Sequence, residues 1–106
     1  MANPTYLRFI EDQPEVSDAF RTLVARTTGA GALDEKTKQL IFLACVATTG
    51  YGAGMTAHID KILAAGGTAD EIREALMVTV PITGIMNLLK VYDTVEDHIA
   101  ARGDTA

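Results

Sequence analysis

The sequence predicts a small all-α protein. Three observations support this: apolar residues recur every three or four positions, glycine and proline divide the chain into pieces of helix length, and helix-start signals precede these pieces. The chain has 106 residues, the length of one ordinary domain. We therefore expect a single helical domain over residues 1–106.

Two helices are expected in the first third of the chain. Asn3 precedes Pro4, and this pairing of a capping residue with a first-turn proline starts a helix. Pro14 repeats the start signal, and Gly29 and Gly31 end the second helix. Between them, apolar residues recur at helical spacing: Val16, Phe20, Leu23 and Val24.

The apolar run at residues 40–47 is predicted to be a central helix that is buried on every side. The run alone would also suit a buried strand, but the polar residues 35–39 extend it to helix length after a cap at Asp34. Cys45 lies in the middle of this run, so we expect an unreactive, buried thiol.

Three more helices are predicted in the second half. The first covers residues 55–65, and Thr68 with Glu71 then forms the capping-box pattern that starts the next, which runs to Pro81. The last helix follows Gly84. Three methionines are expected to fill the core: Met55, Met77 and Met86.

Composition and charge exclude several functions. The formal net charge is −5 and no cluster of lysine or arginine is present, which disfavours nucleic acids and anionic membranes as partners. The longest apolar run is far shorter than the roughly 20 residues of a membrane span. The first residues lack the basic start and apolar core of a signal peptide. We therefore expect a cytoplasmic protein.

The apolar content predicts self-association. Hydrophobic residues make up 48% of the chain, while a chain this short buries only about 60–70% of its surface on folding. The surplus is most simply buried against further copies of the same chain. The alternative is a monomer with an unusually apolar core.

His58 is the first candidate for chemistry. Gly54 and Tyr51 precede it by one and two helical turns, so all three share one face. Because Gly54 has no side chain, a space is expected beside the imidazole, with the Tyr51 phenol at its mouth. A half-buried histidine beside a void suits acid–base chemistry. The alternative is a histidine that only forms a hydrogen bond within the packing.

The other histidine, His98, is expected to be solvated near the end of the last helix. The two histidines lie on separate predicted helices and have no metal-ligand spacing. We therefore expect no metal and no cofactor. The single cysteine excludes an internal disulfide.

Four segments between residues 33 and 95 form a recognisable pattern: residues 33–41, Thr49-Gly50, Ala57-His58-Ile59 and residues 64–76, which include the block AGGTADEIREAL. In these segments the chain resembles the carboxymuconolactone decarboxylase and alkylhydroperoxidase-D-like family. The resemblance implies an alkylhydroperoxidase-D-like bundle of five or six helices. It also implies a homo-oligomer, either a trimer or a hexamer built as a trimer of dimers.

The peroxidase-like members of this family carry a Cys-x-x-Cys pair before the histidine and a glutamate on the preceding helix. His58 matches the histidine, whereas Tyr51 and Gly54 stand at the cysteine positions and Gln39 at the glutamate position. A peroxidatic cycle needs a thiolate and a resolving thiol. Thiol peroxidase activity is therefore disfavoured, because Cys45 lies outside the motif.

Two functions remain open. The resemblance to the decarboxylase-like members implies a lyase of aromatic-compound catabolism that acts on a small carboxylated lactone or oxo-acid. His58 would then move a proton, Tyr51 and Gln39 would donate hydrogen bonds, and Arg73, Lys61 or a neighbouring chain would hold the carboxylate. The alternative is a non-catalytic oligomeric binding or scaffold protein that kept the fold and lost the site.

Overall fold

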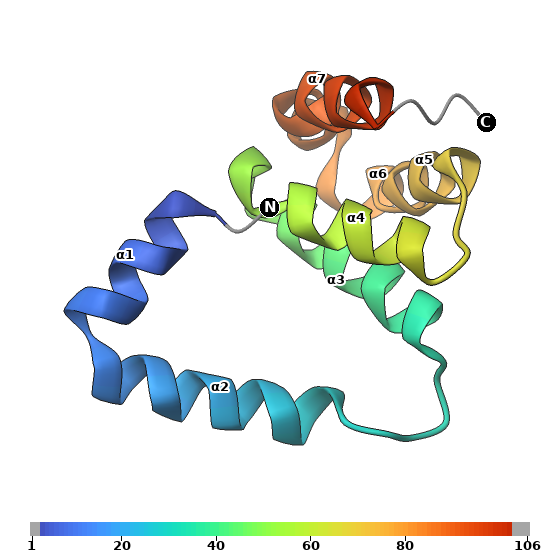
Figure 1. The fold of residues 1–106 in the computed structure, drawn as a ribbon. Helices are drawn as coiled ribbons and strands as arrows, with labels where there is room; N and C mark the ends of the chain where they lie inside the picture. The colour runs from blue at the N-terminus through green and yellow to red at the C-terminus, as the bar shows by residue number, and fades with distance from the viewer. Residues whose placement is uncertain (1–2, 103–106) are drawn as a thin grey trace. The chain divides into compact units, whose positions relative to one another are not determined.

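Residues 3–102 are described by the computed structural model, and every regular element in this range is helical (Figure 1). The all-α prediction is therefore confirmed. The helices fall into two units, one that ends at Asp34 and one that begins at Glu35. Among the described residues, no helix is both long and apolar enough to cross a membrane.

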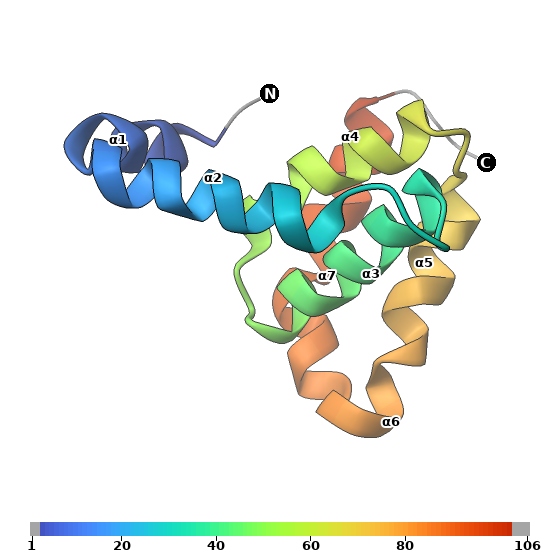
Figure 2. The same ribbon diagram turned by 90° about the horizontal axis from the view of Figure 1, so that it is seen from below.

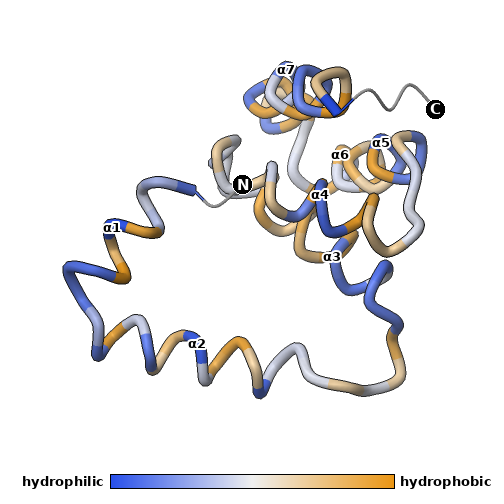
Figure 3. The backbone as a smooth tube through the Cα atoms, in the orientation of Figure 1, coloured by the Kyte–Doolittle hydropathy of each residue, from blue (hydrophilic) through white to orange (hydrophobic). Residues whose placement is uncertain are grey.

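The first unit contains α1 (Pro4–Asp12) and α2 (Pro14–Thr28). The predicted start signal is present, since the side chain of Asn3 accepts a hydrogen bond from the backbone N–H of Thr5 at 3.0 Å. Tyr6 stacks on Phe9 and meets the ring of Phe20 edge-on, which joins the two helices. Apolar and polar residues alternate at helical spacing along α2 (Figure 3).

The second unit runs from Glu35 to the last described helix (Figure 1). Its elements are α3 (Glu35–Thr48), the 3-10 turn η1 (Gly52–Gly54), α4 (Thr56–Ala64), α5 (Ala69–Val78), α6 (Val80–Thr83) and α7 (Ile85–Ala101). The most extensive helix contact is between α3 and α4. In Figure 2, α6 lies at one end of the unit and links α5 to α7.

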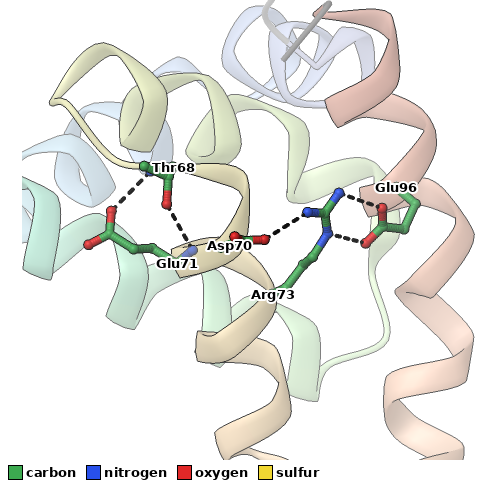
Figure 4. Close-up of polar contacts among 5 residues, drawn as sticks. All are labelled: Thr68, Asp70, Glu71, Arg73 and Glu96. Atoms are coloured by element: carbon green, nitrogen blue, oxygen red, sulfur yellow. Dashed lines mark hydrogen bonds and ion pairs between the residues drawn. The ribbon is translucent and has the colours of Figure 1, made fainter. Parts of the chain in front are cut away.

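The capping box predicted for α5 is present (Figure 4). The hydroxyl of Thr68 accepts from the backbone N–H of Glu71 at 3.1 Å, and the Glu71 carboxylate accepts from the backbone N–H of Thr68 at 3.0 Å. The helix predicted to run on to Pro81 instead ends at Val78. Proline cannot donate to the carbonyl four residues earlier, and its ring collides with that turn, so the chain restarts as the single turn α6.

Apolar side chains of α3, α4, α5 and α7 form the core of this unit, together with Met55. The buried members are Leu43, Ala47, Met55, Ile59, Ile62, Ala69, Ile72, Leu76, Leu88, Val91, Val95 and Ile99. These residues form a core because α3 packs against α4, α5 and α7.

The prediction that α3 is buried on every side is wrong for the single chain. Its buried residues are Gln39, Leu43 and Ala47, which lie four residues apart and form one stripe. Ile41 is 49% exposed and Cys45 is also exposed. The expected burial of the Cys45 thiol is therefore wrong as well, because the other helices of the unit cover only one face of α3.

The prediction for the methionines is correct only in part. Met55 is fully buried, but Met77 and Met86 are 54% and 71% exposed. Both lie within residues 77–89, in and around α6, where six apolar residues are at least half exposed; we call this set the α6 surface. Its members are Met77, Val78, Ile82, Ile85, Met86 and Leu89. Several large apolar side chains left exposed on neighbouring turns of the chain favour an interaction site.

Candidate functional site

The packing of α4 on α3 positions the imidazole of His58, which lies in the first turn of α4. Met55, fully buried, anchors the chain just before this turn. The Nδ1 atom of His58 lies 2.9 Å from Oε1 of Gln39 on α3. The structure therefore brings together two of the three predicted site residues.

Gln39 is almost fully buried, with 5% of its surface exposed. While its Oε1 faces His58, its Nε2 donates a hydrogen bond to Oε1 of Glu35 at 3.1 Å. Both ends of the amide are thus engaged inside the protein. We expected Gln39 to donate to a substrate, whereas the geometry directs its donor at Glu35 and its acceptor at His58.

Two residues of α3, Gln39 and Phe42, contact the imidazole, and Glu35 contacts Gln39 from the same helix. Glu35, Gln39 and Phe42 follow one another at intervals of four and three residues, which places them on one helix face. The ring of Phe42 stacks on His58 with a centroid distance of 5.2 Å and an interplanar angle of 17°. The sequence analysis missed Phe42 and Glu35, although their spacing already placed them on the helix face of Gln39.

The surroundings of His58 favour the neutral imidazole. Burial lowers the pKa of His58 below its ordinary value, and the positive charge of Lys61, one turn further along α4, lowers this pKa further. Within residues 3–102 no hydrogen bond reaches the second ring nitrogen, Nε2. The site therefore offers a neutral, half-buried base with one nitrogen held and one nitrogen available.

Tyr51, the third predicted residue, lies against Gly54. A Cβ atom at Gly54 would stand 2.7 Å from Cδ2 and 3.1 Å from Cε2 of the Tyr51 ring. The space that we expected beside Gly54 is therefore occupied, because Tyr51 folds back over the 3-10 turn that it precedes. The residue as a whole remains 46% exposed.

The guanidinium of Arg73 is already paired with two carboxylates of this chain (Figure 4). Its Nε and Nη2 atoms donate to the two carboxylate oxygens of Glu96 on α7, each at 3.0 Å, and its Nη1 donates to Asp70 at 3.1 Å. This cluster borders a pocket of about 230 Å³ between α5 and α7. Arg73 and Lys61 were the two residues expected to bind a substrate carboxylate. Of these, Lys61 is the one whose charge acts on His58.

His98 is not solvated as predicted. Its Nε2 lies 2.8 Å from Oδ1 of Asp60, and its side chain is only 22% exposed. Arg102 approaches the same oxygen at 3.3 Å. Burial alone would raise the pKa of Asp60, but the hydrogen bond from His98 and the charges of His98 and Arg102 outweigh it and lower this pKa. The cluster ties the end of α7 to α4.

Comparison with known proteins identifies a relative and a family. One relative is the uncharacterized protein MJ1511 of Methanocaldococcus jannaschii, which is 28% identical over 82 residues, covering 77% of this chain and 77% of the relative. No solved structure matches the chain at a significant level. Residues 14–97, most of the chain, match the carboxymuconolactone decarboxylase family. The chain therefore belongs to the carboxymuconolactone decarboxylase family.

Proposed function

We propose that this protein is a lyase that removes the carboxylate from a small lactone or related oxo-acid, with His58 as the acid–base residue. The observation that carries the proposal is the half-buried imidazole, whose Nδ1 is held by Gln39 at 2.9 Å. Its lowered pKa keeps it neutral at pH 7, which is the form that can accept a proton.

The chemistry needs a proton donor at one carbon. When the bond between that carbon and the carboxylate breaks, CO₂ leaves and the electron pair remains on the substrate as an enolate. His58, having taken up a proton from the substrate or from water, returns it to this carbon. The available Nε2 atom is the site of this exchange, since Nδ1 is occupied by Gln39.

Lys61 is the proposed anchor for the substrate carboxylate. It follows His58 by three residues on α4, which places the two side chains on adjacent parts of the helix surface. An ammonium group provides a compact charge for such a carboxylate. Tyr51 is proposed to donate its hydroxyl to the developing enolate oxygen, and its half-exposed position supports this role because a ligand can approach it from solvent.

We further propose that the protein acts as a homo-oligomer, a trimer or a hexamer, in the cytoplasm and in the breakdown of aromatic compounds. The support for assembly is the α6 surface, on which Ile82 is 88% exposed in the single chain. A second copy would remove this apolar surface from water.

The test is CO₂ release by the purified, assembled protein from a panel of small carboxylated lactones. We expect turnover in the wild type and a loss of 100-fold or more in His58→Gln, on the order of the contribution of one general acid–base group. His98→Gln is the matched control, because it removes the other histidine. Equal turnover in the wild type and His58→Gln would contradict the proposed role of His58.

A non-catalytic binding or scaffold member is the second candidate. It is favoured by one observation, the Tyr51 ring that fills the space beside Gly54. A thermal-shift measurement separates the two candidates, because a ligand that binds only the folded state raises its melting temperature. Stabilisation by lactones without any CO₂ release would favour the binding protein.

A further inference from the structure

We infer that Glu35 is a positioning residue that sets the tautomer of His58, acting through the side-chain amide of Gln39. The consequence is that Nδ1 carries the ring proton and Nε2 is the nitrogen that exchanges protons. Its meaning for catalysis rests on the proposed function, but the tautomer itself is a property of the folded chain.

The first step is the orientation of the Gln39 amide. The carboxylate of Glu35 can only accept hydrogen bonds, so the amide end that faces it must be the NH₂ group. The structure has this arrangement, with Nε2 of Gln39 3.1 Å from Oε1 of Glu35. The two residues are four apart on α3, so they are neighbours on the same helix face.

The second step passes this orientation to the imidazole. With Nε2 turned toward Glu35, the carbonyl oxygen of Gln39 faces Nδ1 of His58 at 2.9 Å. A carbonyl oxygen only accepts, so Nδ1 must donate and carries the proton. A neutral imidazole has one ring proton, and Nε2 is then left with its lone pair. In many protein sites, a hydrogen-bond partner on one ring nitrogen fixes the tautomer of a functional histidine.

Packing restricts the alternatives. Gln39 is buried and Phe42 stacks on the imidazole, which limits rotation of both planar groups. The tautomer of His58 can therefore change mainly when the side-chain amide of Gln39 turns over. If Glu35 were replaced by a side chain that can also donate, the amide could turn and present its NH₂ to Nδ1. The ring proton would then move to Nε2.

The experiment is ¹⁵N NMR of the histidine side chains in uniformly labelled protein, at a pH about two units above the ordinary histidine pKa of about 6.5. The protonated and unprotonated ring nitrogens of a neutral imidazole resonate far apart. The chain has two histidines, and His98 is an internal reference, because its Nε2 must donate to the Asp60 carboxylate. We expect opposite tautomers, with the proton on Nδ1 in His58 and on Nε2 in His98.

The diagnostic variant is Glu35→Gln, which keeps the shape of the side chain and gives it a donor. We expect the two ring nitrogens of His58 to shift toward a mixture of tautomers, while those of His98 stay unchanged. Glu74→Gln removes an exposed glutamate of α5 as the matched control and should change neither histidine. A wild-type His58 that carries its proton on Nε2, or a Glu35→Gln spectrum identical to the wild type, would overturn the inference.

The outcome of the NMR experiment does not depend on any substrate. A protein without CO₂ release but with the Nδ1-protonated His58 would retain the inference and lose the lyase proposal. An active lyase whose His58 is protonated on Nε2 would give the reverse outcome.

Discussion

Gln39 on α3 holds His58 on α4 through a contact of 2.9 Å between Oε1 and Nδ1. The peroxidase-like pattern has a glutamate at the position of Gln39. A carboxylate there would bear a negative charge beside the imidazole, whereas the amide provides an acceptor without charge. The protonation equilibrium of His58 should therefore depend on this one residue.

We expect Gln39→Glu to raise the pKa of His58 by about one pH unit, because a nearby carboxylate favours the imidazolium form. NMR titration of the two histidines measures this directly, with His98 as reference. In the control Gln39→Leu, the burial and the charge of Lys61 that lower the pKa of His58 persist, so this pKa should stay low. A Gln39→Glu protein in which His58 titrates as in the wild type would refute the close contact.

The lowered pKa of His58 also predicts how stability depends on pH. Below about pH 6.5, the ordinary histidine pKa, the unfolded chain binds a proton at this position while the folded chain resists it until its own lower pKa is reached. The free energy of unfolding should therefore fall as the pH falls through this window, and His58 should have no effect on its slope above it.

Urea unfolding at a series of pH values checks this prediction. In His58→Gln the contribution from His58 disappears, so the free energy of unfolding should decrease less between about pH 6.5 and pH 5 than in the wild type. His98→Gln is the control, and its free energy of unfolding should retain the pH dependence that comes from His58. Parallel pH profiles for the wild type and His58→Gln would contradict the burial of the imidazole.

The contact between Tyr51 and Gly54 predicts a paired effect. Gly54→Ala places a Cβ atom 2.7 Å from the ring of Tyr51, so the ring must move. We expect a loss of about 1 kcal/mol in the free energy of unfolding, typical of a small overpacking. In a Tyr51→Ala background the same change should be neutral or stabilising, since alanine restricts the unfolded chain more than glycine does.

A double-mutant cycle of these two changes, followed by urea unfolding, measures the coupling. An additive result would mean that the ring does not occupy the space beside Gly54. That outcome would restore the open space predicted from the sequence and would strengthen the lyase proposal over the binding protein.

The elements that sequence analysis predicted best are those specified by local chemistry. The capping box of Thr68 and Glu71 needs only residues three apart, and it forms as expected. The break near Pro81 was expected too, but its position at Thr79 depends on which carbonyl the proline fails to reach. Local signals thus predict which segments become helices, but they predict the ends of those helices less accurately.

Burial and site geometry depend on contacts between distant segments, and here prediction was weaker. Cys45 and Met86 are apolar, yet whether they are covered depends on which helices lie over them. The pairing of His58 with Gln39 requires α4 to pack on α3 in one register. Phe42 could be placed beside His58, and Glu35 behind Gln39, only after that register was known.

The α6 surface provides the last prediction, which concerns assembly. Because Ile82 is 88% exposed in the single chain, Ile82→Glu should change the stability of a monomer by no more than about 0.5 kcal/mol. If this surface joins copies of the chain, the same change buries an unpaired charge, and the assembly should dissociate. Light scattering coupled to size-exclusion chromatography measures the mass of both proteins. Ile82→Val keeps the surface apolar and should assemble as the wild type does, whereas a monomeric wild type, or an Ile82→Glu protein of unchanged mass, would show that this surface does not join the copies.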